Sequence, residues 1–465
     1  MLPVVTPREM ADVDAAADEP VDVLIGRAGR AVAKAAVELL GGVYGRRMVV
    51  VAGKGNNGND GRDAAVRLAR RGVRIAEIPA AEVPPRLPES DLVIDAAYGT
   101  GFRGEYQAPD PGAAPVLAVD IPSGVDGLTG EAAGEPMRAT RTVTFAALKP
   151  GLLFHPGRTL AGEVTLADIG LDVSSARTGV VEASDVAAWL PASLPTAHKW
   201  KAALLVAAGS PGMMGAAHLV AAAAQRAGAG MVRVASPDMG DRAMSQLPIE
   251  AVGVRSGADA WEHAVASELE SGRMHAVVVG PGLGTAQETV ASLRRLLERA
   301  SAPRAEEVAL LVDGDGLTAL GETAQEILKG RPTPAVLTPH DGEYARLMGG
   351  RPDPDRCHAA RQAAQRIRAV VLLKGPTTTV AHPDGRVRLV TTGDQRLATA
   401  GTGDVLSGAI GALLARGMDP FDAASAGAWL HGMAGQKGPA EGLVASDLVA
   451  RLPAAIEAAR SRGGV

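Results

Sequence analysis

Short runs of β-branched and aliphatic residues alternate with helix-forming segments along the chain, and this alternation constrains the fold more than any other feature. In the first part of the chain, the strand-like runs are residues 48–53, 73–78, 91–97, 116–121 and 141–146. A second series comprises residues 203–209, 231–236, 275–280, 308–314, 335–340 and 370–375. Strands separated by helices pair in parallel, because each helix returns the chain to the same edge of the sheet. We therefore predict an α/β protein built on parallel sheets.

The length of the chain indicates more than one domain, because 465 residues exceed what a single hydrophobic core usually holds. Residues 176–197, between the two strand series, contain prolines and show no clear hydrophobic period. We predict that they link a first domain, residues 1–175, to a second, residues 198–465. Beyond the last strand of the second series, Asp384-Gly385 predicts the turn of a β-hairpin.

Composition narrows the class of protein. The net charge of −5 argues against nucleic acid as the main partner, and the longest apolar runs are too short to span a bilayer. The single cysteine, Cys357, cannot form an internal disulfide, and the first residues lack the pattern of a signal peptide. We expect a cytoplasmic protein that acts on small molecules, without nucleic acid or membrane partners, and that forms a homo-oligomer.

The run ATAGTGDVLSG, residues 398–408, predicts a site for phosphoryl transfer. Its glycines precede a helix-forming segment, so backbone N–H groups at the helix N-terminus can close around a phosphate. Asp404 would oppose the charge of that phosphate unless it takes a proton during the reaction, which suggests a base that activates an attacking hydroxyl. The alternative is a first-turn carboxylate that only complements the helix dipole. The narrow GTGD context favours the catalytic role.

Polar residues follow the strands of the first domain where their carboxyl ends should meet. The loop GKGNNGNDG, residues 53–61, also matches the weak dinucleotide pattern G-x-G-x-x-G, and it could be merely a turn that caps a helix. Its several Asn and Asp side chains suit hydrogen bonding and cation ligation better. Asn57, Asp95 and Ser123 would offer oxygen ligands to a hard cation at one edge of the sheet.

Four segments of the second domain are predicted to converge on the GTGD helix. They are residues 198–224, 279–284, 337–347 and 370–380. Taken singly, His340 suits a structural histidine and Lys374 a solvated strand end, but together with Glu343 and GTGD they favour one shared site. No GxxxxGK[ST] motif occurs, so the site is not a P-loop.

The runs NNGNDG, DAAYGTGF and VDIPSGVD make the first domain similar to the NAD(P)H-hydrate epimerase family, as does the segment 148–171. The resemblance implies a Rossmann-like three-layer domain, with K⁺ held by Asn57, Asp95 and Ser123, and with Asp120 as a substrate-contacting and catalytic carboxylate. The implied substrate-binding residues are Asn56, Asn57, Gly58, Asn59, Asp60, Gly99, Thr100, Gly101, Phe102, Arg103, Gly104, Glu105 and Asp120. The family usually has glycine at position 59, so a side chain there would crowd the loop if the backbone required a positive φ.

The second domain resembles the ribokinase-like enzymes, and over residues 198–453 the ADP-dependent NAD(P)H-hydrate dehydratases in particular, through TPHDGE, GTGD and the segment 427–453. The resemblance implies that the hydrated nicotinamide contacts Ala216, Gly282, Gly284, His340 and Asp404. The implied ADP or AMP contacts are Lys374, Gly375, Pro376, Thr377, Thr378 and Gly403. Glu343 would hold Mg²⁺, directly or through water. Gly314, Gly316 and Thr318 depart from the usual motif of the family.

Together these resemblances imply repair of hydrated NADH and NADPH. The first domain would epimerise the R and S hydrates, and the second would dehydrate the S hydrate with ADP, releasing AMP and phosphate. In that reaction Asp404 would deprotonate the hydroxyl that attacks ADP. The residues themselves leave ADP and ATP open as donors. They also leave open a small-molecule kinase, such as one for a vitamin precursor, that carries a non-catalytic ligand-binding first domain.

Overall fold

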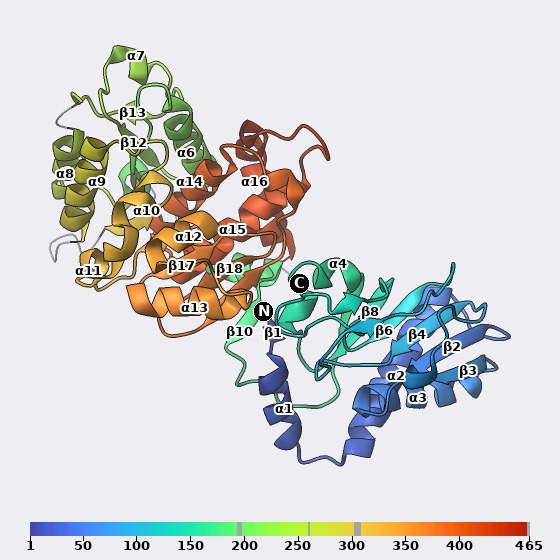
Figure 1. Ribbon diagram of the computed structural model, residues 1–465. Coiled ribbons are helices and arrows are strands. Elements are labelled where there is room, and N and C mark those ends of the chain that lie inside the picture. The colour runs from blue at the N-terminus through green and yellow to red at the C-terminus, as the bar shows by residue number, and fades with distance from the viewer. Residues whose placement is uncertain (193–197, 259–260, 302–307, 463–465) are drawn as a thin grey trace. The chain divides into compact units, whose positions relative to one another are not determined.

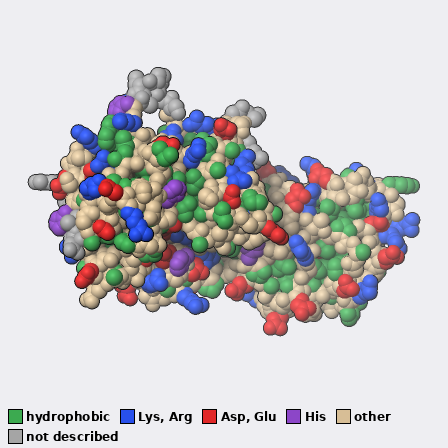
Figure 2. Space-filling model, turned by 90° about the horizontal axis from the view of Figure 1, so that it is seen from above, with side chains coloured by type: hydrophobic (Ala, Val, Ile, Leu, Met, Phe, Trp, Pro, Cys, Tyr) green, Lys and Arg blue, Asp and Glu red, His purple; other side chains and the backbone are tan. Residues whose placement is uncertain are grey.

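The computed structural model describes residues 1–192, 198–258, 261–301 and 308–462, and it divides into two compact units, Leu2–Thr178 and Gly179–Val465 (Figure 1). The division lies near the start of the predicted linker, whose residues 193–197 are outside the described part. Among the described helices, none is long and apolar enough to cross a membrane. Acidic and basic side chains are interspersed on the face that Figure 2 shows.

The N-terminal unit is built on a parallel sheet with the strand order β3-β2-β4-β6-β8-β9. Its strands are β1 (Leu2–Val4), β2 (Arg47–Ala52), β3 (Arg74–Pro79), β4 (Leu92–Ala96), β5 (Tyr106–Gln107), β6 (Val116–Val119), β7 (Gly134–Glu135), β8 (Arg141–Phe145) and β9 (Glu163–Ala167). Its helices are α1 (Pro7–Ala15), α2 (Val21–Leu40), α3 (Asn56–Ala69) and α4 (Gly157–Leu160). Helices α2 and α3 pack on one face of the sheet, and connections around β5 cover the other.

This sheet reverses its strand order at β2. The chain leaves β2 for β3 on one side, and β4 then pairs with β2 on the other. The loops that follow β2 and β4 therefore diverge and leave a crevice at the carboxyl edge, where ligands of open α/β sheets bind. At their first residues, before they diverge, the two loops are in close contact, and Gly53 permits this because a Cβ atom there would lie 1.9 Å from the carbonyl oxygen of Ala97.

The C-terminal unit has a larger sheet with the strand order β10-β19-β18-β17-β16-β15-β14-β11-β12-β13. The strands are β10 (Thr178–Val180), β11 (Ala203–Ala207), β12 (Met231–Ala235), β13 (Val252–Gly253), β14 (Ala276–Val279), β15 (Ala309–Val312), β16 (Val336–Leu337), β17 (Val370–Leu373), β18 (Thr378–Ala381) and β19 (Val387–Val390). Strands β11 to β17 run parallel, whereas β18 pairs antiparallel with β17 and β19. The order reverses at β11, which lies between β12 and β14.

Helices cover both faces of this second sheet (Figure 1). They are α5 (Ala183–Trp189), α6 (Met214–Arg226), α7 (Asp241–Met244), α8 (Trp261–Glu270), α9 (Gln287–Ala300), α10 (Asp315–Leu320), α11 (Ala324–Leu328), α12 (Asp341–Met348), α13 (Arg356–Ile367), α14 (Thr402–Ala415), α15 (Pro420–Gln436) and α16 (Ala445–Arg462). One core layer joins α6, α14, α15 and α16 to the sheet, and another joins α8 to α11. Because aromatic residues make up only 3% of the chain, both layers consist mainly of Ala, Val and Leu.

The eleven strand-like runs read from the sequence all contain strands in the structure, with ends that shift by a few residues. The predicted hairpin is also present: the Gly385 N–H donates to the carbonyl of His382, and Gly385 has a φ of +94°. Strand β9 was not among the predicted runs. Its side chains are partly exposed along its length, so it lacks the continuous apolar run of the buried strands.

Replacing Gly280 by alanine tests how closely backbone segments pack at the carboxyl edge of the second sheet. Gly280 has a φ of +126°, and a Cβ atom there would lie 1.9 Å from the carbonyl oxygen of Asp313. We expect Gly280→Ala to lower the free energy of unfolding of this unit by about 3 kcal/mol. Urea unfolding followed by tryptophan fluorescence checks this, because all four tryptophans lie within Gly179–Val465.

Gly350→Ala is the matched control, since no atom lies within 4 Å of a Cβ atom at Gly350. It should change the free energy of unfolding by no more than about 0.5 kcal/mol. Equal effects of the two substitutions would contradict the packing argument.

Candidate active sites

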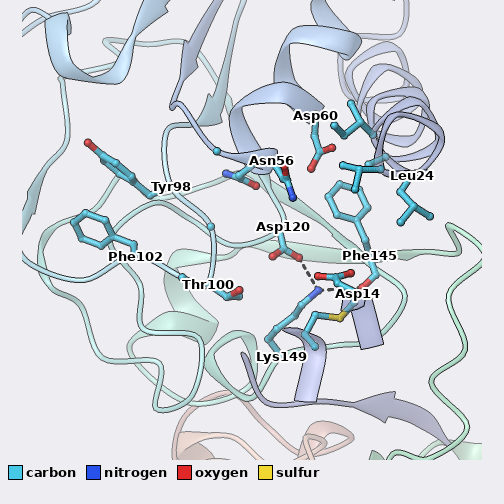
Figure 3. A pocket seen from close by; sticks show the side chains of 18 of the residues that line it. Asp14, Leu24, Asn56, Asp60, Tyr98, Thr100, Phe102, Asp120, Phe145 and Lys149 are labelled. Carbon is cyan, nitrogen blue, oxygen red and sulfur yellow. Dashed lines mark hydrogen bonds and ion pairs between the residues drawn. The ribbon is translucent and has the colours of Figure 1, made fainter. Parts of the chain in front are cut away.

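A cavity of ≈ 770 Å³ lies at the carboxyl edge of the N-terminal sheet (Figure 3). Its polar and aromatic lining comes from the end of β8, from the loops after β2, β4, β6 and β8, and from α1 and α3, whereas α2 contributes aliphatic side chains. Among the lining residues are Asp14, Asn56, Asn57, Asp60, Tyr98, Gly99, Thr100, Gly101, Phe102, Arg103, Asp120, Phe145 and Lys149. The reversal of strand order therefore places a cavity of substrate size where the sequence predicted the first site.

Asp120 and Lys149 form the main ion pair of this cavity. The Lys149 ammonium donates to Asp120 Oδ1 at 2.6 Å, to Thr144 Oγ1 at 2.9 Å and to the Phe145 carbonyl at 3.0 Å. Lys149 is only 1% exposed, and Asp120 takes a φ of +66°, which aspartate tolerates better than most residues. The sequence singled out Asp120 but not Lys149. The only sequence signal for Lys149 was its position in the run LKPG, directly before a turn.

Two further carboxyl groups face this ion pair. Burial raises the pKa of Asp60 to about 8, and the negative charges of Asp120, Asp63 and Asp14 act in the same direction. Burial also raises the pKa of Asp14, an effect that Lys149 opposes. Asp60 is therefore mostly protonated at neutral pH and can donate a hydrogen bond or a proton to a ligand in the cavity.

Of the three predicted cation ligands, Asp95 lies at the end of β4, Ser123 in the loop after β6, and Asn57 in the first turn of α3. Asp95 is fully buried, and it accepts hydrogen bonds from Ser123 Oγ at 2.6 Å and from the Ser123 N–H at 2.9 Å. Burial raises the pKa of Asp95, although these hydrogen bonds oppose the rise. Both amide atoms of Asn57 are buried, and neither has a hydrogen-bond partner among the residues that the structure describes. A Cβ atom at Gly99 would lie 3.6 Å from Asn57 Oδ1. An unpartnered amide oxygen and a buried carboxylate fit a monovalent or divalent hard cation.

The predicted substrate loops are only partly in the cavity wall. Residues Gly99 to Arg103 line it, whereas Gly58, Asn59, Gly104 and Glu105 are not among its lining residues. Asn59 lies in the first turn of α3, so its backbone is helical and needs no positive φ. Its Oδ1 accepts a hydrogen bond from Arg62 at 3.2 Å. The side chain at position 59 thus does not crowd the loop.

An aromatic cluster stands beside this loop. The Tyr98 and Phe102 rings are 4.4 Å apart between centroids, and Tyr106 meets Tyr98 edge-on at 5.3 Å. The chain has only four tyrosines and four phenylalanines, so three of these eight rings gather here. Tyr98 and Phe102 line the cavity and offer an apolar face to a planar ring.

The loops after β11 and β14 come together at the point where the second sheet reverses. Ser210 Oγ donates to the Gly282 carbonyl at 2.9 Å, and a Cβ atom at Gly282 would lie 2.7 Å from Ala216 Cβ. The Gly284 N–H donates to Asp315 Oδ2 at 2.7 Å. The structure thus brings the predicted residues Ala216, Gly282 and Gly284 together. Asp315, which the sequence did not single out, fixes the last of them.

The predicted base, Asp404, and the predicted lysine, Lys374, lie in one acidic cluster, which also contains Asp313, Asp315 and Glu343. Lys374 Nζ donates to Asp313 Oδ1 at 2.6 Å. Burial raises the pKa of Asp404 to about 6, with Asp313 and Asp315 acting in the same direction and Lys374 opposing them. Burial would lower the pKa of Lys374, but Asp313, Glu343 and Asp404 together raise it, so the lysine is charged. A Cβ atom at Gly403 would lie 3.6 Å from Lys374 Nζ, so the GTGD helix begins beside this charge.

His340 and Glu343 begin helix α12 with a reciprocal cap. His340 Nδ1 accepts from the Gly342 N–H at 2.9 Å, and Glu343 Oε2 accepts from the His340 N–H at 2.8 Å. Burial raises the pKa of Glu343, which lies in the field of both Lys374 and Asp313. The cap holds Glu343 at the edge of the acidic cluster and leaves the His340 imidazole largely exposed, with 57% of the side chain accessible.

The predicted nucleotide segment connects β17 to β18. Arg356 donates to the Lys374 carbonyl at 2.7 Å, and Thr378 Oγ1 lies 3.5 Å from the Gly375 carbonyl. Thr377 is buried, with 1% exposure. Hydrogen bonds thus hold residues 374–378 in place, and the side chain of Lys374 extends to Asp313 in the acidic cluster.

Sequence reasoning also missed His431, which lies on α15 behind the GTGD helix. Burial lowers its pKa to about 4, so its ring is neutral, and Nε2 has no hydrogen-bond partner in the part of the chain described. Asp313 and His431 are distant from Asp404 in sequence, and Ser407, although it lies within the GTGD motif, has its partner Asp313 94 residues away. Only the tertiary fold brings them to Asp404 and Lys374.

One α/β unit has a polar cavity at its switch point, and the other has the GTGD helix beside an acidic cluster. Together they define a two-domain enzyme of the ribokinase-like class with a Rossmann-like partner domain. The family model described as NAD(P)H-hydrate dehydratase matches residues 204–457, and the model described as YjeF-related protein N-terminus matches residues 21–86 and 75–151. The chain belongs to the family of bifunctional NAD(P)H-hydrate repair enzymes.

Named relatives cover most of the chain. The bifunctional NAD(P)H-hydrate repair enzyme of Mycobacterium tuberculosis is 40% identical over 414 residues, which are 83% of this chain and 82% of the relative. That of Moorella thermoacetica is 34% identical and covers 97% of this chain and 96% of its own length. The ADP/ATP-dependent NAD(P)H-hydrate dehydratase of Bacillus subtilis, crystallised with ATP and Mg²⁺, aligns with a TM-score of 0.51 at 28% identity over 60% of this chain and 98% of its own. The resemblance inferred from the motifs is confirmed.

Replacing Asp60 by asparagine tests the pKa of the cavity carboxyl. With a folded pKa of about 8 against an unfolded value of 3.8, the folded state binds the extra proton between these values, so Asp60 makes stability fall as pH rises through that window. Asp60→Asn removes this dependence. As the pH rises from 5 to 8, we expect the free energy of unfolding of the variant to increase by a few kcal/mol relative to that of the natural chain.

Amide hydrogen exchange of β2 and β4 in the full chain measures this difference at each pH. Asp18→Asn, which removes the same charge from an exposed position, is the control and should show no pH-dependent gain. A stability difference for Asp60→Asn that stays constant from pH 5 to pH 8 would rule out the raised pKa.

Proposed function

We propose that the chain repairs hydrated NADH and NADPH. The N-terminal unit interconverts the R and S hydrates, and the C-terminal unit dehydrates the S hydrate with ADP, giving the reduced cofactor, AMP and phosphate. The observation that carries this proposal is the placement of Asp404, with a pKa of about 6, at the start of the GTGD helix and in the field of Lys374.

In the C-terminal unit, Asp404 takes the proton of the substrate hydroxyl while that oxygen attacks the terminal phosphorus of ADP. The bond between this phosphorus and the bridging oxygen breaks, and AMP leaves. Phosphate is a far better leaving group than hydroxide, so the electron pair of the ring nitrogen expels it and leaves an iminium ion. Loss of a proton from the adjacent ring carbon to solvent then restores the dihydronicotinamide. The Lys374 ammonium and the first N–H groups of α14 stabilise negative charge on the transferring group.

The chemistry of this cluster also fits Mg²⁺, which prefers carboxylate oxygens and retains water ligands. Glu343 would hold it, with the remaining ligands coming from water and ADP oxygens. This agrees with the finding that no group of three or more His, Cys, Asp or Glu side chains is arranged around a metal position in the described ranges. When bound, the ion would neutralise charge on the phosphates.

In the N-terminal unit, Asp120 contacts the hydrate and exchanges a proton with it. Lys149 holds the Asp120 carboxylate in place through their 2.6 Å ion pair. Asn57, Asp95 and Ser123 would hold K⁺ beside the loop of residues 99–103. The unpartnered amide of Asn57 and the buried Asp95 support this assignment. The substrates are small molecules, and the homo-oligomeric state, cytoplasmic location and lack of nucleic acid or membrane partners stay predictions from the sequence.

Replacing Asp404 by asparagine should lower ADP-dependent dehydration by about 10³-fold, because the general base is lost while the shape of the site is kept. ADP binding, measured by calorimetry, should change little. For the natural chain, activity should fall below about pH 6, where Asp404 becomes protonated. Near-normal turnover of Asp404→Asn would contradict the assignment of Asp404 as the general base.

The product distinguishes this activity from a small-molecule kinase. A dehydratase restores the absorbance of the reduced nicotinamide and releases free phosphate, whereas a kinase leaves a stable phosphate ester. Chromatography of the reaction of the full chain with NADH hydrate and ADP separates the two outcomes.

Replacing Asn57 by alanine tests the cation site of the N-terminal unit. Loss of one oxygen ligand should raise the K⁺ concentration for half-maximal epimerisation by about tenfold, equivalent to 1.4 kcal/mol. Epimerisation is followed by chromatography of the two hydrates. The dehydratase reaction of the same protein is the internal control and should keep its rate. An unchanged K⁺ dependence would contradict the role of Asn57.

A further inference from the structure

The carboxylate of Asp313 connects two parts of the C-terminal site. Asp313 follows the last residue of β15 and is 3% exposed. Its Oδ1 accepts a hydrogen bond from Lys374 Nζ at 2.6 Å, and its Oδ2 accepts one from Ser407 Oγ at 2.7 Å. One buried side chain therefore holds the end of β17 and the helix α14 together, and both of its oxygens are occupied.

The contact with Ser407 sets the position of the GTGD helix. Ser407 is fully buried and lies three residues after Asp404, so the two side chains share one face of α14. A rotation or shift of α14 that moved Asp404 would break the 2.7 Å bond between Ser407 and Asp313. A Cβ atom at Gly403 would lie 3.9 Å from Asp313 Oδ2, so the first turn of the helix also approaches this carboxylate.

We propose that Asp313 is the positioning residue of the phosphoryl-transfer site: it holds the Lys374 ammonium and the Asp404 carboxylate in one fixed arrangement around the transferring phosphate. Asp313 itself does not contact the substrate in this assignment, because its oxygens are used by Lys374 and Ser407. The inference rests on the proposed function of the C-terminal unit and adds a residue that none of its motifs identified.

The charge of Asp313 affects the pKa of Asp404, which a purely structural contact would leave unchanged. Asp404 is surrounded by Asp313 and Asp315 at the end of β15 and by Lys374 at the end of β17. Beyond Lys374 lie Glu343 on α12 and His431 on α15, which lie in the field of that lysine. After burial, Asp313 is the largest influence that raises the pKa of Asp404, and Lys374 opposes it. Removing the Asp313 charge both ends the repulsion and frees the positive charge of Lys374, so each effect lowers the pKa of Asp404.

The test compares the pH profile of kcat for ADP-dependent dehydration in Asp313→Asn and Ser407→Ala, both in the full chain. Asp313→Asn should move the acid limb to lower pH by about one unit. It should also lower kcat at the optimum by about 100-fold while the KM for ADP changes less than about threefold, because Asp313 touches neither substrate. Ser407→Ala removes one hydrogen bond without changing any charge, so it should lower kcat and leave the acid limb in place.

Asp313→Glu supplies a second variant if asparagine prevents folding, which tryptophan fluorescence reports. Glutamate keeps the charge but displaces the carboxylate by one methylene, so kcat should fall while the acid limb stays near that of the natural chain. An unmoved acid limb in Asp313→Asn, or an equal shift in Ser407→Ala, overturns the inference. Absence of ADP-dependent recovery of the reduced cofactor in the natural chain would instead overturn the proposed function.

Discussion

Both sites depend on close contact between backbone segments at the carboxyl edge of a parallel sheet. In each unit, a glycine that follows one strand faces the carbonyl oxygen of the residue that follows the next: Gly53 faces Ala97, and Gly280 faces Asp313. A side chain at either glycine would separate the two loops. Their close approach brings polar side chains of neighbouring strands within reach of one ligand. The strands can be almost wholly apolar because their functional residues lie just beyond their ends.

Each unit also places one lysine among several carboxylates. Lys149 is paired with Asp120 in the presence of Asp14 and Asp60, and Lys374 is paired with Asp313 in the presence of Asp404. One cation cannot neutralise every neighbouring carboxyl group, so burial shifts the pKa of the remaining ones upward. Asp60 and Asp404 therefore have pKa values close to neutrality, which suits proton exchange with a substrate. Burial, reinforced by neighbouring carboxylates that a single lysine does not neutralise, gives each site a carboxyl group that titrates near neutrality.

Much of this arrangement could be predicted from the sequence, because buried parallel strands leave continuous apolar runs and the glycine-rich motifs follow them directly. The GTGD helix, Asp120 and the Asn57 loop were found in this way. Lys149, Asp313, Ser407 and His431 were not, because their roles depend on contacts between segments far apart in the chain. No apolar run marks strand β9, with the sequence EVTLA, because it is partly exposed, and only the resemblance of residues 148–171 to the final strands of the epimerase family indicated it.

Asn59 illustrates how the local structure can accommodate a departure from a family pattern. Its side chain accepts a hydrogen bond from Arg62, which also donates to the Gly53 carbonyl at 2.9 Å and pairs with Glu77 at 2.7 Å. An asparagine has fewer backbone conformations in the unfolded chain than a glycine, so ordering this turn costs less entropy, by up to about 1 kcal/mol. The first turn of α3, which carries the cavity residues Asn56 and Asn57, is therefore preorganised before any ligand arrives, and binding there should require little rearrangement.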